Sequence, residues 1–109
     1  MGKASYAEIY NMPQAEYLDM FSGVQFTLVV NGIAKSLVGA TIEMTIKGLE
    51  EQTLSIGNGI TLVNAAAGVF NVDAQIITLR PGKYTHEIKF TFAGGIPKTY
   101  IEGTWIITR

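Results

Sequence analysis

Apolar and polar residues alternate with a period of two along most of the chain after residue 23. The clearest stretches are 24–31, 41–47, 84–92 and 98–108, in which nearly every second residue is apolar. Because successive side chains of a strand point to opposite faces of its sheet, this alternation predicts strands with one buried and one solvated face. Two shorter strands are expected between residues 60 and 72, and no stretch is typical of a long helix.

Glycine-containing dipeptides separate these stretches. Asn31-Gly32, Asn58-Gly59 and Gly94-Gly95 are hairpin signals, because glycine and asparagine tolerate the positive φ angles of tight turns. Pro81-Gly82 predicts the centre of a type II turn, with glycine at the third position. About seven short strands joined by such turns predict an all-β fold, an antiparallel β-sandwich. A closed barrel is the alternative architecture.

Residues 1–23 are expected to form a non-β arm that precedes a domain of residues 24–109. They hold three of the five tyrosines and no period-two alternation, and Pro13 separates two short stretches of helical spacing. Aromatic residues are rare in disordered tails and tyrosine is enriched at interfaces, so we expect a docking arm. A neighbouring subunit and the chain's own domain are equally good surfaces for it. The candidate interface residues of the arm are Tyr6, Ile9, Tyr10, Tyr17, Leu18 and Phe21.

The composition indicates a surface that is partly covered by another molecule. Only 16% of the residues are charged, against about 25% in an average globular domain, and the net charge is −1. This favours an oligomer or a component of an assembly. No basic run is present, so nucleic-acid binding is not expected. No stretch is typical of a signal peptide or a membrane span, so we expect synthesis in the cytoplasm and no membrane contact.

Residue types that carry chemistry are sparse. The single histidine, His86, lies on the apolar face of its predicted strand and is expected to be a packed core residue rather than a catalyst. There are no cysteines and only two aspartates, and no serine lies in a Gly-x-Ser-x-Gly motif. We therefore expect no enzyme activity, no metal site and no cofactor.

The two faces of the last predicted strand differ. Trp105 alternates with Ile101 and Ile107 and is expected in the core, whereas an exposed tryptophan would favour stacking on a sugar. Tyr100 and Ile106 are expected on the opposite face, which is more apolar than a solvated face needs to be. These two residues are the second set of interface candidates.

Three segments together resemble a known family. They are GVQFTLVVNGIAKSLVGATIEMTIK (23–47), GVFNVDAQIITLRPGKYTHEIKF (68–90) and YIEGTWIITR (100–109). Their order of strands and turns resembles immunoglobulin-like domains of tailed-phage structural proteins, especially the N-terminal domain of baseplate upper proteins. The resemblance covers residues 23–109 and contains no catalytic motif. Ser36 and His86-Glu87 depart from the acidic corner residue and the Tyr-Asp pair of that family.

Five residues of this pattern are expected to have structural roles. Gly39 stands at the corner between the first two strands, where glycine permits a sharp or positive-φ turn. Gly82 and Tyr84 match the family's Gly-x-Tyr signature, and Gly103 matches the glycine of its closing strand. Trp105 completes the set as the expected centre of the core.

The resemblance implies an immunoglobulin-like β-sandwich that serves as a non-enzymatic structural protein of a phage virion. Because a baseplate upper protein continues into a fibre, this chain looks like a free-standing relative, either a capsid auxiliary or decoration protein or a tail-associated one. The implied partners are capsid, portal or tail proteins and further copies of the chain. The implied location is the virion, after synthesis in the host cytoplasm. A carbohydrate-binding adhesion module, with a glycan as ligand, is the alternative.

Overall fold

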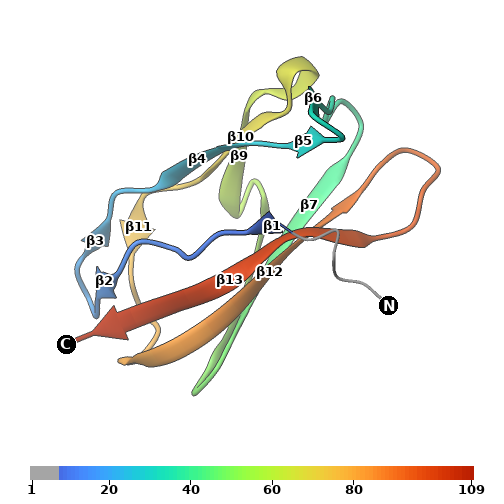
Figure 1. The fold of residues 1–109 in the computed structure, drawn as a ribbon. Coiled ribbons are helices and arrows are strands. Elements are labelled where there is room, and N and C mark those ends of the chain that lie inside the picture. Colours follow the sequence, from blue (N-terminus) through green and yellow to red (C-terminus); the bar gives the residue numbers. More distant parts are fainter. Residues whose placement is uncertain (1–7) are drawn as a thin grey trace.

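The computed structural model describes residues 8–109, and strands are the main secondary structure of this part of the chain (Figure 1). The all-β prediction is confirmed. The strands are β1 (Glu8–Ile9), β2 (Ala15–Glu16), β3 (Met20–Phe21), β4 (Val24–Thr27), β5 (Val29–Val30), β6 (Ile33–Ala34), β7 (Thr41–Lys47), β8 (Glu51–Ile56), β9 (Gly59–Asn64), β10 (Val69–Val72), β11 (Gln75–Ile76), β12 (Gly82–Thr91) and β13 (Lys98–Thr108). One short 3-10 helix, η2 (Ala65–Ala67), lies between β9 and β10.

Nine of these strands form one curled sheet. Its order is β1-β13-β12-β7-β8-β9-β10-β4, and β2 also pairs with β13. The sheet is mixed rather than antiparallel as predicted, because β1 and β2 run parallel to β13 and a tight turn joins β8 to β9 in a short parallel pairing. The pairs β3–β11 and β5–β6 are separate two-stranded sheets. Figure 1 shows the large sheet folding over, so that β4 and β10 lie across from β12 and β13 with the core between them.

The predicted alternation is present in the long strands. Buried and exposed side chains alternate along β7 and along β12, and the buried side chains of both strands face one apolar core. Burial of one face therefore fixes the register of these strands, since a slip by one residue would expose it. The buried residues of β7, β12 and β13 are Ile42, Met44, Ile46, Tyr84, His86, Ile88, Phe90, Ile101, Trp105 and Ile107.

The described part of the predicted arm, residues 8–23, belongs to the domain. The N–H groups of Tyr10, Met12 and Tyr17 donate to carbonyl oxygens of β13 at 2.8, 2.8 and 2.7 Å. Phe21 is buried in the core. The prediction of a non-β arm is therefore wrong for residues 8–21, because the edge of β13 provides the hydrogen bonds that these short strands need. Residues 1–7, with the predicted contact of Tyr6, lie outside the described residues.

Tyr100 interrupts the alternation of β13. Ile101 lies opposite Ile88 of β12, but Thr99 lies opposite Lys89, so Tyr100 is the extra residue of a β-bulge. The bulge turns Tyr100 toward the core ring of Phe90, with the ring centroids 5.8 Å apart. The prediction that Tyr100 shares the outer face with Ile106 is therefore wrong.

Most of the glycine turns have the predicted geometry. Asn31 and Gly32 have φ angles of 55° and 78°, as a type I′ hairpin turn requires. Gly59 and Gly94 also have positive φ, at 96° and 74°. Gly82 does not, and it is the first residue of β12, so the prediction of a type II turn centred on Pro81-Gly82 is wrong.

Gly39 occupies the predicted corner with a φ of 76°. We predict that Gly39→Val lowers the free energy of unfolding by about 1–2 kcal/mol, because a residue with a Cβ pays roughly this cost in the left-handed region. Denaturant unfolding measures the change. Gly39→Asn is the matched control, since asparagine visits this region at lower cost. Equal stability of the valine variant and the parent would contradict the role of the corner.

Candidate functional site

His86 lies buried on the core face of β12, as predicted. Its side chain is 1% exposed and stands opposite Gly103 of β13 and Ile46 of β7. Nε2 lies 2.8 Å from the carbonyl oxygen of Tyr10, so this nitrogen carries the proton and donates it. Burial lowers the pKa of His86, and the hydrogen bond to Tyr10 and the charge of Glu102 only partly oppose this. His86 is therefore a neutral hydrogen-bond donor that holds the N-terminal segment.

Gly103 makes room for this contact. A Cβ atom built on Gly103 would overlap the carbonyl oxygen of Tyr10. Beside it, the side-chain oxygen of Asn11 accepts from the N–H and the hydroxyl of Thr104 at 3.0 and 3.1 Å. The segment between β1 and β2 is thus fixed to both β12 and β13.

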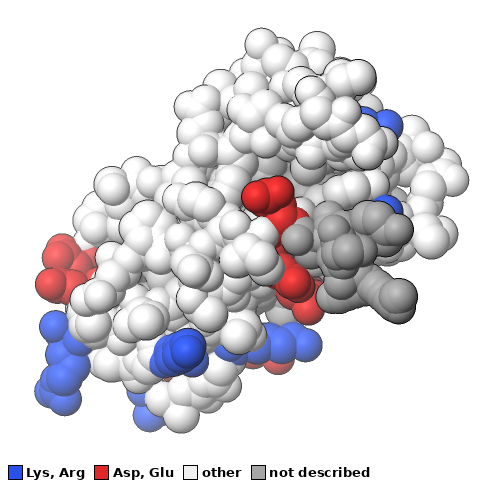
Figure 2. Space-filling model, viewed as in Figure 1, with Lys and Arg blue, Asp and Glu red and all other residues white. Residues whose placement is uncertain are grey.

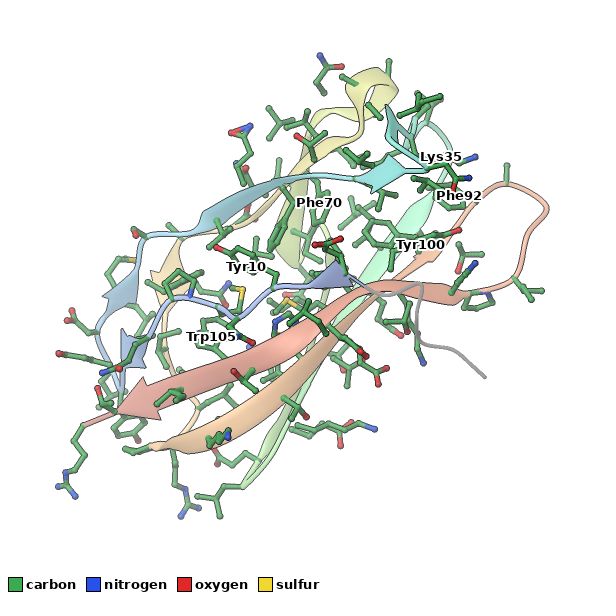
Figure 3. All side chains as sticks on the ribbon, in the orientation of Figure 1. Tyr10, Lys35, Phe70, Phe92, Tyr100 and Trp105 are labelled. Atoms are coloured by element: carbon green, nitrogen blue, oxygen red, sulfur yellow. The ribbon has the colours of Figure 1, made fainter. Side chains whose placement is uncertain are left out.

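A row of aromatic rings runs through the core from β1 to the loop between β12 and β13 (Figure 3). Tyr10 contacts Phe26 with ring centroids 5.0 Å apart, and Phe26 stacks on Phe70 at 5.2 Å. Phe70 contacts Phe90 at 5.5 Å, which in turn contacts Tyr100. Such pairs favour offset or edge-to-face geometry and stabilise a core beyond the area they bury. The row connects the N-terminal segment with the base of the loops at its other end.

These loops form a surface that we call the loop end: the β5–β6 hairpin, the turn of residues 35–40 and the β12–β13 loop of residues 92–97. The ammonium group of Lys35 lies 4.8 Å from the ring centroid of Phe92 and so joins the turn to the β12–β13 loop. Figure 2 shows few charged side chains on the visible face over β4, β5 and β10. The exposed apolar side chains of the loop end are Val29 (53%), Ile33 (72%), Val38 (67%) and Ile96 (82%). Large apolar side chains exposed in several loops at one end of a domain are typical of a protein-interaction site.

A groove leads from the loop end along β1. It consists of two adjoining cavities of about 300 and 490 Å³ that share Glu8, Val29 and Tyr100 as lining residues. The inner cavity is also lined by Tyr10, Phe26 and Ile101. The inner cavity is therefore mainly apolar, whereas the outer cavity is more polar and has both Glu8 and Lys98 in its lining.

The predicted interface residues do not form one surface. Ile9 is 62% exposed at the rim of the groove, and Tyr10 and Tyr100 line it. Phe21 is buried with its ring 4.9 Å from that of Trp105, so the prediction of an interface role for Phe21 is wrong. Trp105 is 1% exposed, as expected for a core residue, and offers no ring to an external sugar.

The remaining candidates lie away from the loop end. Tyr17 and Leu18 are exposed, and Leu18 donates its N–H to the carbonyl oxygen of Ile77. Met20 and Ile76, which pair across the small β3–β11 sheet, are also exposed. These four side chains are a second set of exposed apolar residues, and Ile106 is separately exposed on β13 at 42%.

Sequence reasoning missed the four apolar residues of the loop end. The alternating stretch contains Val29, and the predicted turns contain Ile33 and Val38. Neither pattern indicates whether another segment covers these side chains. A signal was nevertheless present, since Ile33, Val38 and Ile96 lie within two residues of a glycine in segments that the pattern assigned to turns. Large apolar side chains in turns have no core to enter and point to a partner.

Other kinds of site have no support in the described residues. Across residues 8–109, no group of three or more histidine, cysteine, aspartate or glutamate side chains is arranged to hold a metal ion. No helix in this range is long and apolar enough to cross a membrane. Comparisons with protein-family models, curated proteins and solved structures found no match to the chain.

The Gly103 recess leads to a stability prediction. We expect Gly103→Ala to lower the free energy of unfolding by about 1–3 kcal/mol, the usual cost of an extra methyl group in a packed site. Gly82→Ala is the matched control, because its Cβ would only reach ordinary contact distance, 3.8 Å, from the Tyr84 ring. Chemical denaturation and limited proteolysis at residues 8–16 measure the effect. Equal stability of the two variants would show that the segment does not need the recess.

The buried His86 leads to a pH prediction. Because its pKa is lowered in the folded state from an ordinary value of 6.5, the unfolded chain binds the proton first as the pH falls. Stability should therefore be fully present above this value and decrease below it, by at most about 1.4 kcal/mol per pH unit. Denaturant unfolding between pH 7.5 and 5.5 measures this slope. His86→Gln keeps a donor for Tyr10 without titrating and should flatten it; an unchanged slope would exclude His86 as its source.

Proposed function

We propose that this protein is a non-enzymatic attachment protein of a tailed-phage virion, built on an immunoglobulin-like β-sandwich. The strand order supports this fold. β13, β12, β7 and β8 are consecutive neighbours, as are β9, β10 and β4, and the tight turn between β8 and β9 joins the two groups. Two groups of strands packed face to face over a common core are the architecture of an immunoglobulin-like sandwich.

A tyrosine near the start of β12 supports the same fold. The hydroxyl of Tyr84 donates to the carbonyl oxygen of Arg80, four residues upstream, at 2.8 Å. Its ring packs against Gly48, where a Cβ would meet it at 2.7 Å. Immunoglobulin-like domains use a tyrosine in this position, bonded back to the chain before it, to fix the corner that leads into the strand.

The observation that carries the attachment function is the exposure of Val29, Ile33, Val38 and Ile96 at one end of the domain. Sandwich domains commonly bind through loops clustered at one end. Four large apolar side chains in water cost free energy that a partner surface would recover, at about 25 cal/mol per Å² of apolar area covered. The sequence resemblance to phage structural domains makes a virion protein the proposed partner.

The carbohydrate-binding alternative has less support from the same residues. Stacking on a pyranose needs an exposed ring, and Trp105 lies in the core. Tyr100 is half-buried against Phe90 and Phe92, with centroid distances of 5.8 and 6.0 Å. No aromatic face of β13 is therefore fully free for a sugar.

We predict that the protein is present in purified particles of the phage that encodes it, at a copy number set by its site. Peptide mass spectrometry measures this number. Abundance near that of the major capsid protein indicates a capsid auxiliary protein, and a few copies indicate the tail, baseplate or portal. Its absence from particles would overturn the virion proposal.

The loop end provides the matched variants for this experiment. Ile33→Asp combined with Ile96→Asp should leave the fold intact and reduce the number of bound copies at least tenfold, because both carboxylates would be buried on attachment. Val63→Asp changes an apolar residue of β9 that is 51% exposed outside the loop end and should bind as the parent does. Equal incorporation of both variants would exclude the loop end as the attachment surface.

A further inference from the structure

The two free edges of the curled sheet face each other. β1 is at one end of the strand order and β4 at the other, and each has only one strand partner in the part of the chain that the structure describes. Tyr10 of the first edge and Phe26 of the second touch across the gap, 5.0 Å between ring centroids. Figure 1 shows β4–β5 and β1–β2 as two neighbouring, oppositely directed runs that are joined at one end. The groove lies between them, and we call it the seam.

The wall formed by β4 and β5 presents backbone groups to the seam. Both backbone groups of Leu28 point away from the seam. Its N–H donates to the carbonyl oxygen of Gly68 at 2.8 Å, and its carbonyl oxygen accepts from the N–H of Lys35 at 2.9 Å. Leu28 joins β4 to β5, and the backbone groups of consecutive residues in an extended chain point to opposite sides. The N–H and C=O groups of Thr27 and Val29 therefore point into the seam, where both residues line the cavity.

The wall formed by β1 does the same. Tyr10 and Met12 donate their N–H groups to Glu102 and Thr104 of β13. By the same alternation, the backbone groups of Ile9 point away from β13 and into the seam, which Ile9 also lines. The seam thus has hydrogen-bonding backbone on both sides and apolar rings in its floor.

We propose that the seam receives one extended segment of another protein as an added strand, which closes the curled sheet. This rests on the proposed attachment function and names the chemistry of its partner. Only an extended backbone offers donors and acceptors at the spacing that two facing strand edges require. Every second side chain of the segment would enter the floor formed by Tyr10, Phe26 and Tyr100, so the segment carries apolar residues at alternate positions.

The large sheet of a folded second copy, as the described residues show it, does not offer a strand for this site. An edge strand of a folded sheet is already covered on one side by its neighbour, whereas the seam needs a strand that is free on both sides. The free edges of the large sheet in a second copy are its own β1 and β4, which lie in the walls of its own seam. The occupant is therefore a segment outside a sheet, such as a terminal or linker stretch of a partner.

A display library of random twelve-residue peptides, panned against the full-length protein, tests this proposal. We expect enriched peptides with apolar residues at every second position. N-methylation removes a backbone donor without changing a side chain, and it should weaken binding of a synthetic enriched peptide at least tenfold at alternate positions only. Hydrogen exchange should slow at the amides of Ile9, Thr27 and Val29 when the peptide is bound.

Val29→Pro removes one donor of the seam wall and should weaken the peptide at least tenfold, while Val29→Thr retains that donor and should bind as the parent does. Proline is tolerated on an edge strand whose N–H is not used in the sheet. If Val29→Pro does not fold, the series of N-methylated peptides still tests whether the segment binds through its backbone. Lack of enrichment over the bare support, or binding insensitive to N-methylation at every position, would overturn the proposal. Concentration-dependent self-association that protects the same amides would also contradict the proposal, because the occupant of the seam would then be a second copy of this chain. None of these results depends on whether the protein is found in particles.

Discussion

Pairing on both edges of β13 is the constraint on which the rest of the structure depends. Along one edge, β12 pairs with nearly the whole strand, and along the other edge β1 and β2 bind in parallel. The second pairing is possible only because Gly103 leaves space for the Tyr10 carbonyl, which then accepts from His86. A buried backbone carbonyl without a donor would cost about 1–3 kcal/mol, so glycine and histidine form a unit. One position provides the space and its cross-strand neighbour provides the hydrogen bond.

This unit determines how the two walls of the seam are held. Because His86 and β13 fix Tyr10, its ring is in position to meet Phe26, and the row continues through Phe70 and Phe90 to Tyr100. Movement of the N-terminal segment would therefore reach the ring contacts below the loop end. The Tyr100 bulge adds to this coupling, since it places a ring of β13 where regular alternation would have put it on the opposite face.

The sequence was sufficient for β7 and β12. It was insufficient for the shortest strands and for the six-residue β8, in which only Leu54 is buried and no alternation is visible. Seven residues of β7 and ten of β12 are long enough for alternation to identify a buried face. β1, β2 and β3 have two residues each, too few to show any period, and they exist because β13 and β11 offer them hydrogen bonds. The same limit explains why Phe21 was assigned to an interface. The aromatic content of the arm led us to expect a covering surface and an interface role for Phe21, but the surface that covers Phe21 is the domain's own core.

The loop end and the seam were also beyond the alternation pattern, for different physical reasons. Exposure of Ile33 or Ile96 depends on which segments cover a turn, and that is decided by the packing of three loops. The backbone groups of Thr27 and Val29 point away from the hydrogen-bond partners of Leu28, so their direction depends on where Gly68 and Lys35 lie. Side-chain alternation distinguishes the two faces of a strand but not which of its two edges is paired, so the pattern does not predict this direction.

An open sheet edge is normally a liability, because its free N–H and C=O groups pair with other chains. Here the two edges of the large sheet face one another across a gap in which the Tyr10 and Phe26 rings meet. An edge strand of a neighbouring folded sheet is free on one side only and does not satisfy both of these edges. The gap still admits a single strand that is free on both sides. The curled form therefore combines protection against edge-to-edge aggregation with the capacity to bind one extended segment, whereas a flat sheet leaves its edges open. The short length of β1 limits how much backbone remains unpaired when the seam is empty.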